Sequence, residues 1–194
     1  PAQQRARRGF LYVGRLDPEK GVTILAVAAR NCDVELRVAG TGPCVDEFGG
    51  MPNATLLGGL AAQQVREEMG SALAVVVPSI WYENFPRTIV EAFATATPVI
   101  ASRIGALASL VEDGKTGLLF QPGDPGDLQQ KLDWARANPL AMAEMGQAAR
   151  RQYLEKYSPG VNHAQLLAIY REAIADMARP VREPELQVGR SDAV

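Results

Sequence analysis

The sequence has few of the residues that bind metals through nitrogen or sulfur. Its 194 residues include one histidine, His163, and two cysteines, Cys32 and Cys44. The cysteines are too far apart for a C-x-x-C site, and a structural zinc ion needs four such ligands. We therefore expect two reduced thiols and no zinc site. A Ser-His-Asp triad is also disfavoured, because the single histidine lies in a late helical stretch beside polar residues.

Neither sign of charge dominates the sequence. The formal net charge is -2 at pH 7, so the basic surface typical of nucleic-acid-binding proteins is missing. No apolar run approaches the ~18 residues that span a bilayer, and no apolar stretch of the secretory type follows the N-terminal arginines. We expect a cytoplasmic protein that binds no nucleic acid. Pro1 in place of a methionine indicates a fragment or a processed chain.

The sequence does contain enough apolar residues, 47%, to build a sizeable core. Strand-like and helix-like patterns alternate along its first two thirds, which predicts an α/β fold with a Rossmann-like, doubly wound parallel sheet. Strands are expected over 9–16, 34–40, 54–60, 73–79, 98–102 and 116–120, with helices over 20–31, 61–72 and 87–96.

After Pro122 the pattern becomes helical, with helices expected over 127–138, 139–157 and 162–178. Three segments follow from these patterns. Residues 1–8 form a polar N-terminal tail, residues 9–178 form the Rossmann-like domain including the C-terminal helices, and residues 179–194 form a disordered tail.

Ligands of open parallel sheets bind at the carboxyl ends of the strands, so the loops there are the first candidates for a site. Arg15 and Lys20 follow the first strand, beside the expected start of a helix whose dipole favours an anion. This arrangement is suited to a diphosphate. A solvated surface turn is an equally good interpretation of the same residues.

Glu83 lies in the loop after the fourth strand, and Glu91, eight positions later, lies about one turn inside the helix that follows. A carboxylate accepts two hydrogen bonds, and a pair of vicinal hydroxyls donates two, so each glutamate could bind one polyol. Arg87 and Thr88 begin the next helix and offer backbone N–H groups to a phosphate between them, while Pro86 fits at the helix start. The structural alternative is a capping role for Glu83 and an exposed helix position for Glu91.

Three blocks carry a resemblance to a known family. FLYVGRLDPEKGV (10–22), PSIWYENFPRTIVEAFATATPVIAS (78–102) and EDGKTGLLFQPGD (112–124) resemble the donor-binding half of the family 4 glycosyltransferases. Those enzymes are retaining transferases with a GT-B fold, in which the active site lies between two Rossmann-like domains. The resemblance covers roughly residues 9 to 157.

The resemblance implies a role for each matching residue. Arg15 and Lys20 correspond to the basic pair that holds the diphosphate of a nucleotide sugar. Glu83 corresponds to the glutamate that faces the donor sugar, and Glu91 to the one that binds the ribose hydroxyls. The implied catalytic residues are thus Glu83, Arg15 and Lys20, and the implied donor-binding residues are Gly14, Arg15, Lys20, Glu83, Asn84, Phe85, Pro86, Arg87, Thr88 and Glu91.

The resemblance also implies partners and cofactors. The donor is a nucleotide-diphosphate sugar, and no metal or other cofactor is expected, because protein cations take the charge on the leaving diphosphate. The acceptor is held by an N-terminal domain that these residues do not include. Without it, an apolar face of the last helix favours self-association. In the full-length enzyme, peripheral contact with a membrane stays open.

Two positions depart from the family pattern. Pro86-Arg87 stands where many relatives have glycine after the phenylalanine, and Ala96 stands where an A-x-G-x-P stretch has glycine. The second change affects helix-to-strand packing more than chemistry. Two other functions remain open at this point: a nucleotide-sugar binding module without turnover, and a sugar-nucleotide epimerase of the same fold.

Overall fold

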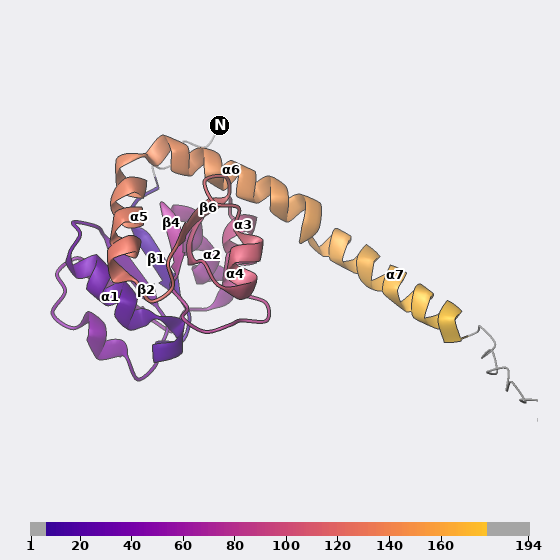
Figure 1. Ribbon diagram of the computed structural model, residues 1–194, viewed down its shortest axis with the longest axis horizontal. Coiled ribbons are helices and arrows are strands. Elements are labelled where there is room, and N and C mark those ends of the chain that lie inside the picture. The colour runs from indigo at the N-terminus through magenta and orange to yellow at the C-terminus, as the bar shows by residue number, and fades with distance from the viewer. Residues whose placement is uncertain (1–6, 178–194) are drawn as a thin grey trace, which may run out of the picture. The chain divides into compact units, whose positions relative to one another are not determined.

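The computed structural model describes residues 7–177, and this part of the chain divides after Tyr157 (Figure 1). Residues up to Tyr157 form an α/β domain, and helix α7 (Pro159–Met177) belongs to a second unit. The sequence assigned both to one domain, and that assignment of α7 stays a prediction. The expectations for residues 1–6 and 178–194 lie outside the described residues.

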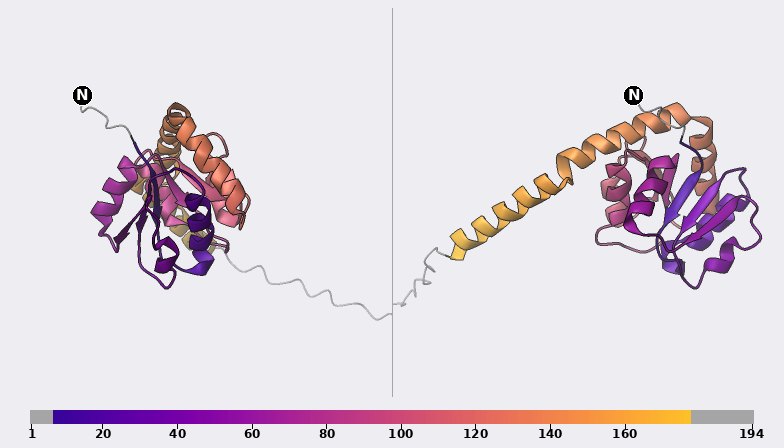
Figure 2. Two further views of the ribbon diagram at one scale, coloured as in Figure 1. Left: turned by 90° about the vertical axis from the view of Figure 1, so that its left-hand side faces the viewer. Right: turned by 180° about the vertical axis from the view of Figure 1, so that it is seen from behind.

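The domain is built on a six-stranded, fully parallel sheet (Figures 1 and 2). The strand order is β3-β2-β1-β4-β5-β6, so the chain fills one side of β1 first and then the other. This order confirms the predicted doubly wound, Rossmann-like sheet. The strands are β1 (Phe10–Val13), β2 (Leu36–Ala39), β3 (Ala54–Gly58), β4 (Ala74–Val77), β5 (Val99–Ser102) and β6 (Gly117–Phe120).

Helices cover both faces of the sheet, which explains why the central strands are apolar without alternation (Figure 2). In β1, Phe10 and Tyr12 belong to one core and Leu11 to the other. The first core is closed by α1 (Val22–Arg30) and α5 (Pro125–Ala137). The second is closed by α2 (Ala62–Ser71), α3 (Arg87–Ala94) and α4 (Gly105–Leu110).

Helix α6 (Pro139–Lys156) contributes to both cores. Its Met142 belongs to the first core and its Ala149 to the second. Between them, Gly146 allows a close approach, because a Cβ atom there would lie 2.3 Å from the carbonyl oxygen of Ala96. Ala96 itself has a φ of 56° and is the one non-glycine residue with positive φ in the described part of the chain. The left-handed conformation explains why the family pattern has glycine at this position.

Two residues of the predicted N-terminal tail bond to the domain. The Arg7 guanidinium donates to the Thr95 carbonyl oxygen at 2.8 Å and to the hydroxyl of the buried Thr97. The backbone N–H of Arg8 donates to the Ser71 carbonyl oxygen at 3.0 Å. The packed domain therefore includes residues 7 and 8.

Local structure differs from the expectations at three short elements. Lys20 ends a separate 3-10 helix, η1 (Pro18–Lys20), instead of opening α1. A second 3-10 helix, η2 (Val45–Phe48), and the six-residue α4 were not expected, because elements this short show no periodicity in sequence. Among the described residues, no helix combines the length and the hydropathy needed to cross a membrane.

Candidate functional site

The strand order reverses between β1 and β4, and the loops after these two strands leave a crevice at the carboxyl edge of the sheet. Its volume is about 60 Å³. Five of the residues singled out from sequence meet here. The crevice is lined by Tyr12, Val13, Gly14 and Lys20 on one side, and by Val76, Val77, Pro78, Ser79, Glu83, Pro86 and Thr88 on the other.

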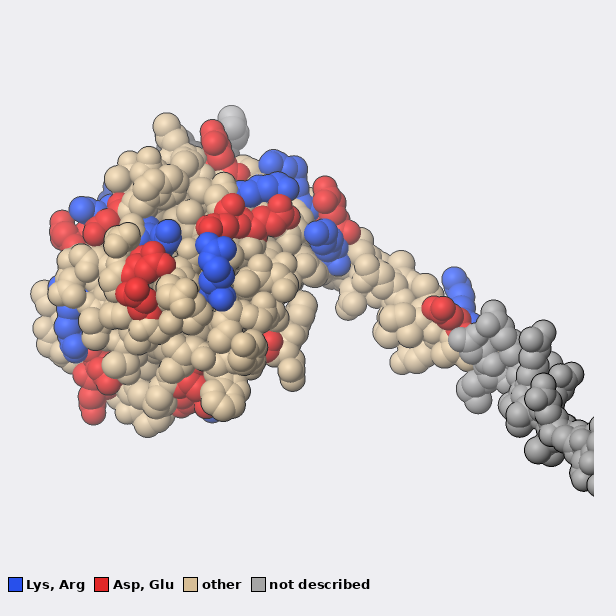
Figure 3. Space-filling view, in the orientation of Figure 1, with Lys and Arg blue, Asp and Glu red and all other residues tan. Residues whose placement is uncertain are grey.

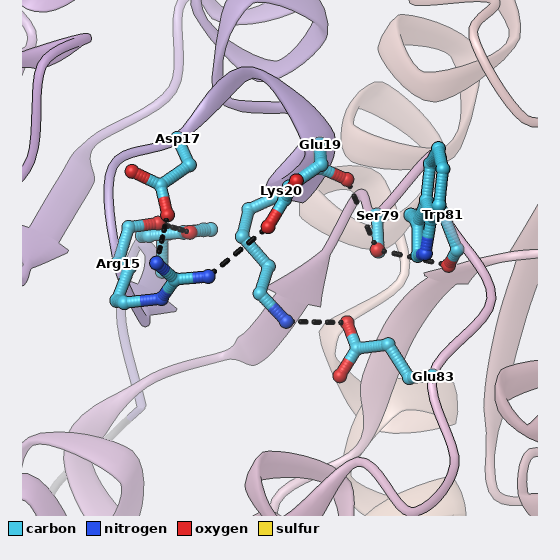
Figure 4. A network of polar contacts seen from close by, with 8 residues as sticks. Arg15, Asp17, Glu19, Lys20, Ser79, Trp81 and Glu83 are labelled. Atoms are coloured by element: carbon cyan, nitrogen blue, oxygen red, sulfur yellow. Dashed lines mark hydrogen bonds and ion pairs between the residues drawn. The ribbon is translucent and has the colours of Figure 1, made fainter.

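The two loops are held against each other by backbone contacts (Figure 4). Gly21 has a φ of 68°, and a Cβ atom there would lie 1.9 Å from the carbonyl oxygen of Pro78. Only glycine fits, so the start of α1 lies directly against the end of β4. The Glu19 carbonyl oxygen then accepts from the Ser79 hydroxyl at 3.2 Å and from the Ile80 N–H at 3.1 Å. These contacts fix the positions of Lys20 and Glu83 on opposite sides of the crevice.

Lys20 and Glu83 form an ion pair across the crevice, with 3.1 Å between Nζ and Oε1 (Figure 4). Both side chains are largely enclosed, with exposures of 28% and 20%. The sequence assigned them to different parts of a ligand, and the structure brings them into direct contact. An anion that binds Lys20 must therefore share the ammonium group with Glu83 or displace its carboxylate.

Arg15 lies outside the crevice and is 68% exposed (Figure 4). Its guanidinium contacts Asp17 at 2.7 Å and Glu19 at 3.0 Å, and its carbonyl oxygen accepts from the Tyr12 hydroxyl at 2.5 Å. Burial, together with the nearby carboxylates of Asp17 and Glu83, raises the pKa of Tyr12 well above its usual range. The Tyr12 hydroxyl therefore stays protonated and keeps donating to the turn that carries Arg15.

Glu91 lines a second and much larger cavity, of about 700 Å³. Its Oε1 atom lies 3.1 Å from Arg87, one turn earlier in α3. The two glutamates thus serve different cavities, and Thr88 of the crevice and Arg87 of the large cavity are adjacent at the start of α3. The large cavity is lined by Val13, Leu60, Ala62, Val65, Arg66, Phe85, Arg87, Val90, Glu91, Ala94, Tyr153 and Tyr157.

Nine of these twelve lining residues were not among those that the sequence indicated. Leu60 follows β3, and Val65 and Arg66 lie in α2. Leu60 could have been found from its place at a strand end. Tyr153 and Tyr157 could not, since they lie in and just after a helix more than sixty residues from Glu91. The Tyr157 ring packs edge-on against Phe85, with 6.4 Å between ring centroids.

Asn84 is the last of the predicted residues. It is exposed in the loop between β4 and α3, and together with Phe85 it lines a third hollow of about 280 Å³. Charges of both signs are interspersed over the face of the domain shown in Figure 3. No cluster of three or more His, Cys, Asp or Glu side chains suited to a metal occurs in residues 7–177.

Known proteins that are similar to this chain match it over the α/β domain that carries these residues. A family model described as "Glycosyl transferases group 1" matches residues 3–152. The chain is 32% identical over 191 residues to an MMP alpha-(1->4)-mannosyltransferase of Mycolicibacterium hassiacum, covering 92% of this chain and 46% of that protein. It is 30% identical over 188 residues to a phosphatidyl-myo-inositol mannosyltransferase of Mycobacterium leprae, covering 92% and 50%.

Several solved structures have a fold similar to that of this chain. A sucrose-phosphate synthase from Thermosynechococcus elongatus superposes with a TM-score of 0.80 at 28% identity, covering 88% of this chain and 47% of that one. Anabaena HepE, solved with UDP and glucose, gives a TM-score of 0.78 at 23% identity and covers 86% and 49%. The chain spans half or less of the length of these relatives.

Proposed function

The chain belongs to the glycosyl transferases of group 1, and from this premise we propose that it is the donor-binding half of a retaining, family 4 glycosyltransferase. In this proposal it binds a nucleotide-diphosphate sugar from which a hexose-type sugar is transferred. The observation that carries it is the crevice at the reversal of strand order, where Lys20, Glu83 and the start of α3 meet beside a cavity large enough for a nucleoside.

The diphosphate binds between Lys20 and the start of α3. The first N–H groups of a helix have no partner within the helix, and Arg87 and Thr88 present theirs at this edge of the sheet. Lys20 adds a cation that a dianionic ligand can draw away from Glu83. Arg15 contributes through its electrostatic field at the edge of the crevice, since its side chain is exposed and already contacts two carboxylates.

The nucleoside occupies the 700 Å³ cavity. Leu60, Val65 and Val90 supply the apolar surface that a base needs, and the Glu91 carboxylate can accept from both ribose hydroxyls. On the other side of the diphosphate, Glu83 faces the sugar. The proposed order of sugar, diphosphate and nucleoside thus runs from Glu83, through the crevice at the start of α3, to the large cavity beside Glu91.

Catalysis in this proposal relies on electrostatic stabilisation. As the bond between the sugar and the diphosphate breaks, negative charge grows on the leaving oxygen, and Lys20 and the amides of α3 are fixed beside it. No metal is needed for that step. The relatives support a transferase, because their names describe mannosyl transfer and, for HepE, a complex with UDP and glucose.

The acceptor requires a second half of the enzyme. Since the chain spans about half the length of its relatives, we propose that an N-terminal domain closes over the carboxyl edge of the sheet. In α7, the apolar side chains Leu166, Ile169, Tyr170 and Ile174 share one helical face. We propose that this face packs against that domain, or against a second copy when the domain is absent. The enzyme works in the cytoplasm in this scheme.

A calorimetric screen tests the proposed function. The chain is titrated with UDP-, GDP- and ADP-glucose and with GDP-mannose, and one nucleotide series is expected to bind. A Lys131→Ala variant is the matched control, because Lys131 contacts Asp127 on α5, away from the lining of the three cavities. Lack of binding by every nucleotide sugar would reject the proposal.

Two further functions are tested with the preferred donor. A binding module without turnover predicts no transfer even when the acceptor half is supplied. An epimerase predicts release of the epimeric nucleotide sugar without any acceptor, which mass spectrometry with chromatographic separation detects. We expect neither outcome, because the named relatives are transferases.

A further inference from the structure

The large cavity, of about 700 Å³, has walls on three helices. Among its lining residues, Val65 belongs to α2, Ala94 to α3 and Tyr153 to α6. Lining residues keep their positions only when neighbouring packing and hydrogen bonds hold them. The width of the cavity therefore depends on the places where these helices are joined to one another. Two arginines that do not line the cavity, Arg7 and Arg150, lie at such joints.

Arg150 joins α6 to α3 through two residues of the cavity wall. Its guanidinium donates to the carbonyl oxygen of Ala94, the last residue of α3. The same guanidinium lies 5.1 Å from the centre of the Tyr153 ring, a distance at which a cation and an aromatic ring attract each other. The last carbonyl groups of a helix have no partner within the helix, and the helix dipole favours a cation beside them. Arg150 therefore ties α6 to the end of α3 and packs on the Tyr153 ring.

Arg7 joins α2 to the same end of α3. In addition to its bonds to Thr95 and Thr97, its guanidinium reaches the carbonyl oxygen of Ala72, at the end of α2, at 3.5 Å. The Thr97 hydroxyl donates in turn to the Met69 carbonyl oxygen of α2 at 2.8 Å. Thr97 is fully buried, so loss of Arg7 would remove a partner from a polar group inside the domain. Arg7 and Thr97 thus connect the C-terminal ends of α2 and α3.

Each of these arginines is followed by another arginine in a different environment. Arg8 and Arg151 are exposed, whereas Arg7 and Arg150 are partly buried. Within each pair, an alanine substitution removes the same charge at neighbouring positions of the chain. The two pairs therefore separate the effect of the contacts from the effect of the charge.

We propose that Arg7 and Arg150 are positioning residues that set the width of the large cavity and, through it, the affinity for the nucleoside part of the donor. This role rests on the proposed function, which assigns the nucleoside to that cavity. Arg7 acts through α2, and Arg150 acts through α6 and Tyr153. The crevice of Lys20 lies between the ends of β1 and β4, so binding of a diphosphate alone does not depend on either arginine.

Calorimetry with UDP and GDP tests the proposal in Arg7→Ala and Arg150→Ala, with Arg8→Ala and Arg151→Ala as matched controls. The titrations are made at low temperature on variants whose fold is checked by circular dichroism, so that lower stability alone leaves the affinity unchanged. We expect roughly tenfold weaker binding of the preferred nucleotide in the first two variants, and less than about a twofold change in the controls. Pyrophosphate, added as a competitor of the bound nucleotide, should keep its inhibition constant in all four.

Lysine variants extend the test. Arg7→Lys and Arg150→Lys keep a charged donor but lose the planar guanidinium, so each should recover part of the nucleotide affinity that the alanine variant loses. Where an alanine variant does not fold, the lysine variant takes its place and should still bind the nucleotide more weakly than the unsubstituted chain.

Two results would overturn the proposal while leaving the donor function intact. The first is unchanged nucleotide affinity in the Arg7 and Arg150 variants together with a lower melting temperature, which would assign both arginines to stability alone. The second is a parallel loss of nucleotide and pyrophosphate binding, which would indicate a general change of the site. If the unsubstituted chain binds no nucleotide, the donor function is rejected, and the proposed role of the two arginines is rejected with it.

Discussion

The two glutamates at the start of α3 sit in matching ion pairs with opposite surroundings. In both Lys20–Glu83 and Arg87–Glu91 the nitrogen and oxygen are 3.1 Å apart. The exposures are 28% and 20% in the first pair, and 83% and 41% in the second. Water screens the second pair strongly, so its interaction is weak and easily exchanged. The same distance therefore describes a firm contact in one place and a loose one in the other.

The cavities around the pairs differ in the same direction. The crevice of Lys20 and Glu83 measures about 60 Å³, and the cavity of Arg87 and Glu91 about 700 Å³. In the proposed function, the small and charged crevice takes the diphosphate, and the wide cavity with apolar walls and a carboxylate at its rim takes the nucleoside. One nucleotide sugar would then span both, with its charge at the narrow end.

The largest effect should come from breaking the enclosed pair. Lys20→Ala removes the cation beside the proposed diphosphate and should weaken nucleoside diphosphate binding by about 1.5–3 kcal/mol, the range for charge-assisted hydrogen bonds. Arg15→Ala should cost less than about 1 kcal/mol, because its guanidinium is exposed and paired. Calorimetry with UDP and GDP measures both. Equal losses would contradict the distinction between enclosed and exposed cations.

The next effect separates the glutamates. Glu91→Ala should weaken binding of the bare nucleoside diphosphate about tenfold, because the ribose loses its acceptor. Glu83→Ala should leave that affinity unchanged or raise it, since Lys20 is freed, and should weaken only the sugar-bearing donor. The isosteric Glu83→Gln and Glu91→Gln variants serve as controls for packing. If both alanine variants lose the bare nucleotide equally, the division of roles is wrong.

A smaller effect should appear away from both cavities. Ala96 has a left-handed backbone conformation, which glycine adopts without strain. Ala96→Gly should therefore stabilise the domain by about 1 kcal/mol, a gain that the greater freedom of glycine in the unfolded chain partly offsets. This corresponds to a melting temperature higher by about 2–4 °C. Nucleotide affinity should stay the same. A lower melting temperature would show that Ala96 is not strained.

The last prediction is that removing divalent metal ions leaves the affinity unchanged. Nucleotide-sugar affinity in excess EDTA should equal that in magnesium, because Lys20 and the α3 amides are proposed to neutralise the diphosphate without an ion. The readout is a pair of titrations on one protein preparation. A loss of affinity on chelation would indicate that a metal bridges the phosphates and that the proposed charge balance is incomplete.

Much of this arrangement could be predicted from the sequence. Periodicity and turn residues predicted the six strands and their parallel direction, because apolar runs such as residues 75–77 are typical of strands covered on both faces. The same reasoning placed Lys20 and Glu83 at the right edge. It did not show that they are paired, since the contact depends on the fit between Gly21 and Pro78, which are 57 positions apart.

Other parts had no signal that sequence reasoning could use. Arg15 and Lys20 are equivalent cations in sequence, and only the structure shows that Arg15 is exposed and paired with Asp17 and Glu19. The walls of the large cavity come from the end of β1, the loop after β3, α2, α3 and the end of α6, which no local pattern connects. Trp81 and Tyr82 read as apolar loop residues until their exposure is seen.

The central position of β1 has a consequence for how the domain is made. Phe10 pairs with Leu36 on one side and with Ala74 on the other, so the second edge of β1 stays open during synthesis until β4 has emerged. Closing that long loop is a slow, non-local event. The crevice is formed by the same event, since it lies between the ends of these strands. If the crevice binds a nucleotide as proposed, binding would report that β1 and β4 have paired, and a nascent chain that ends before residue 74 would lack one side of the site.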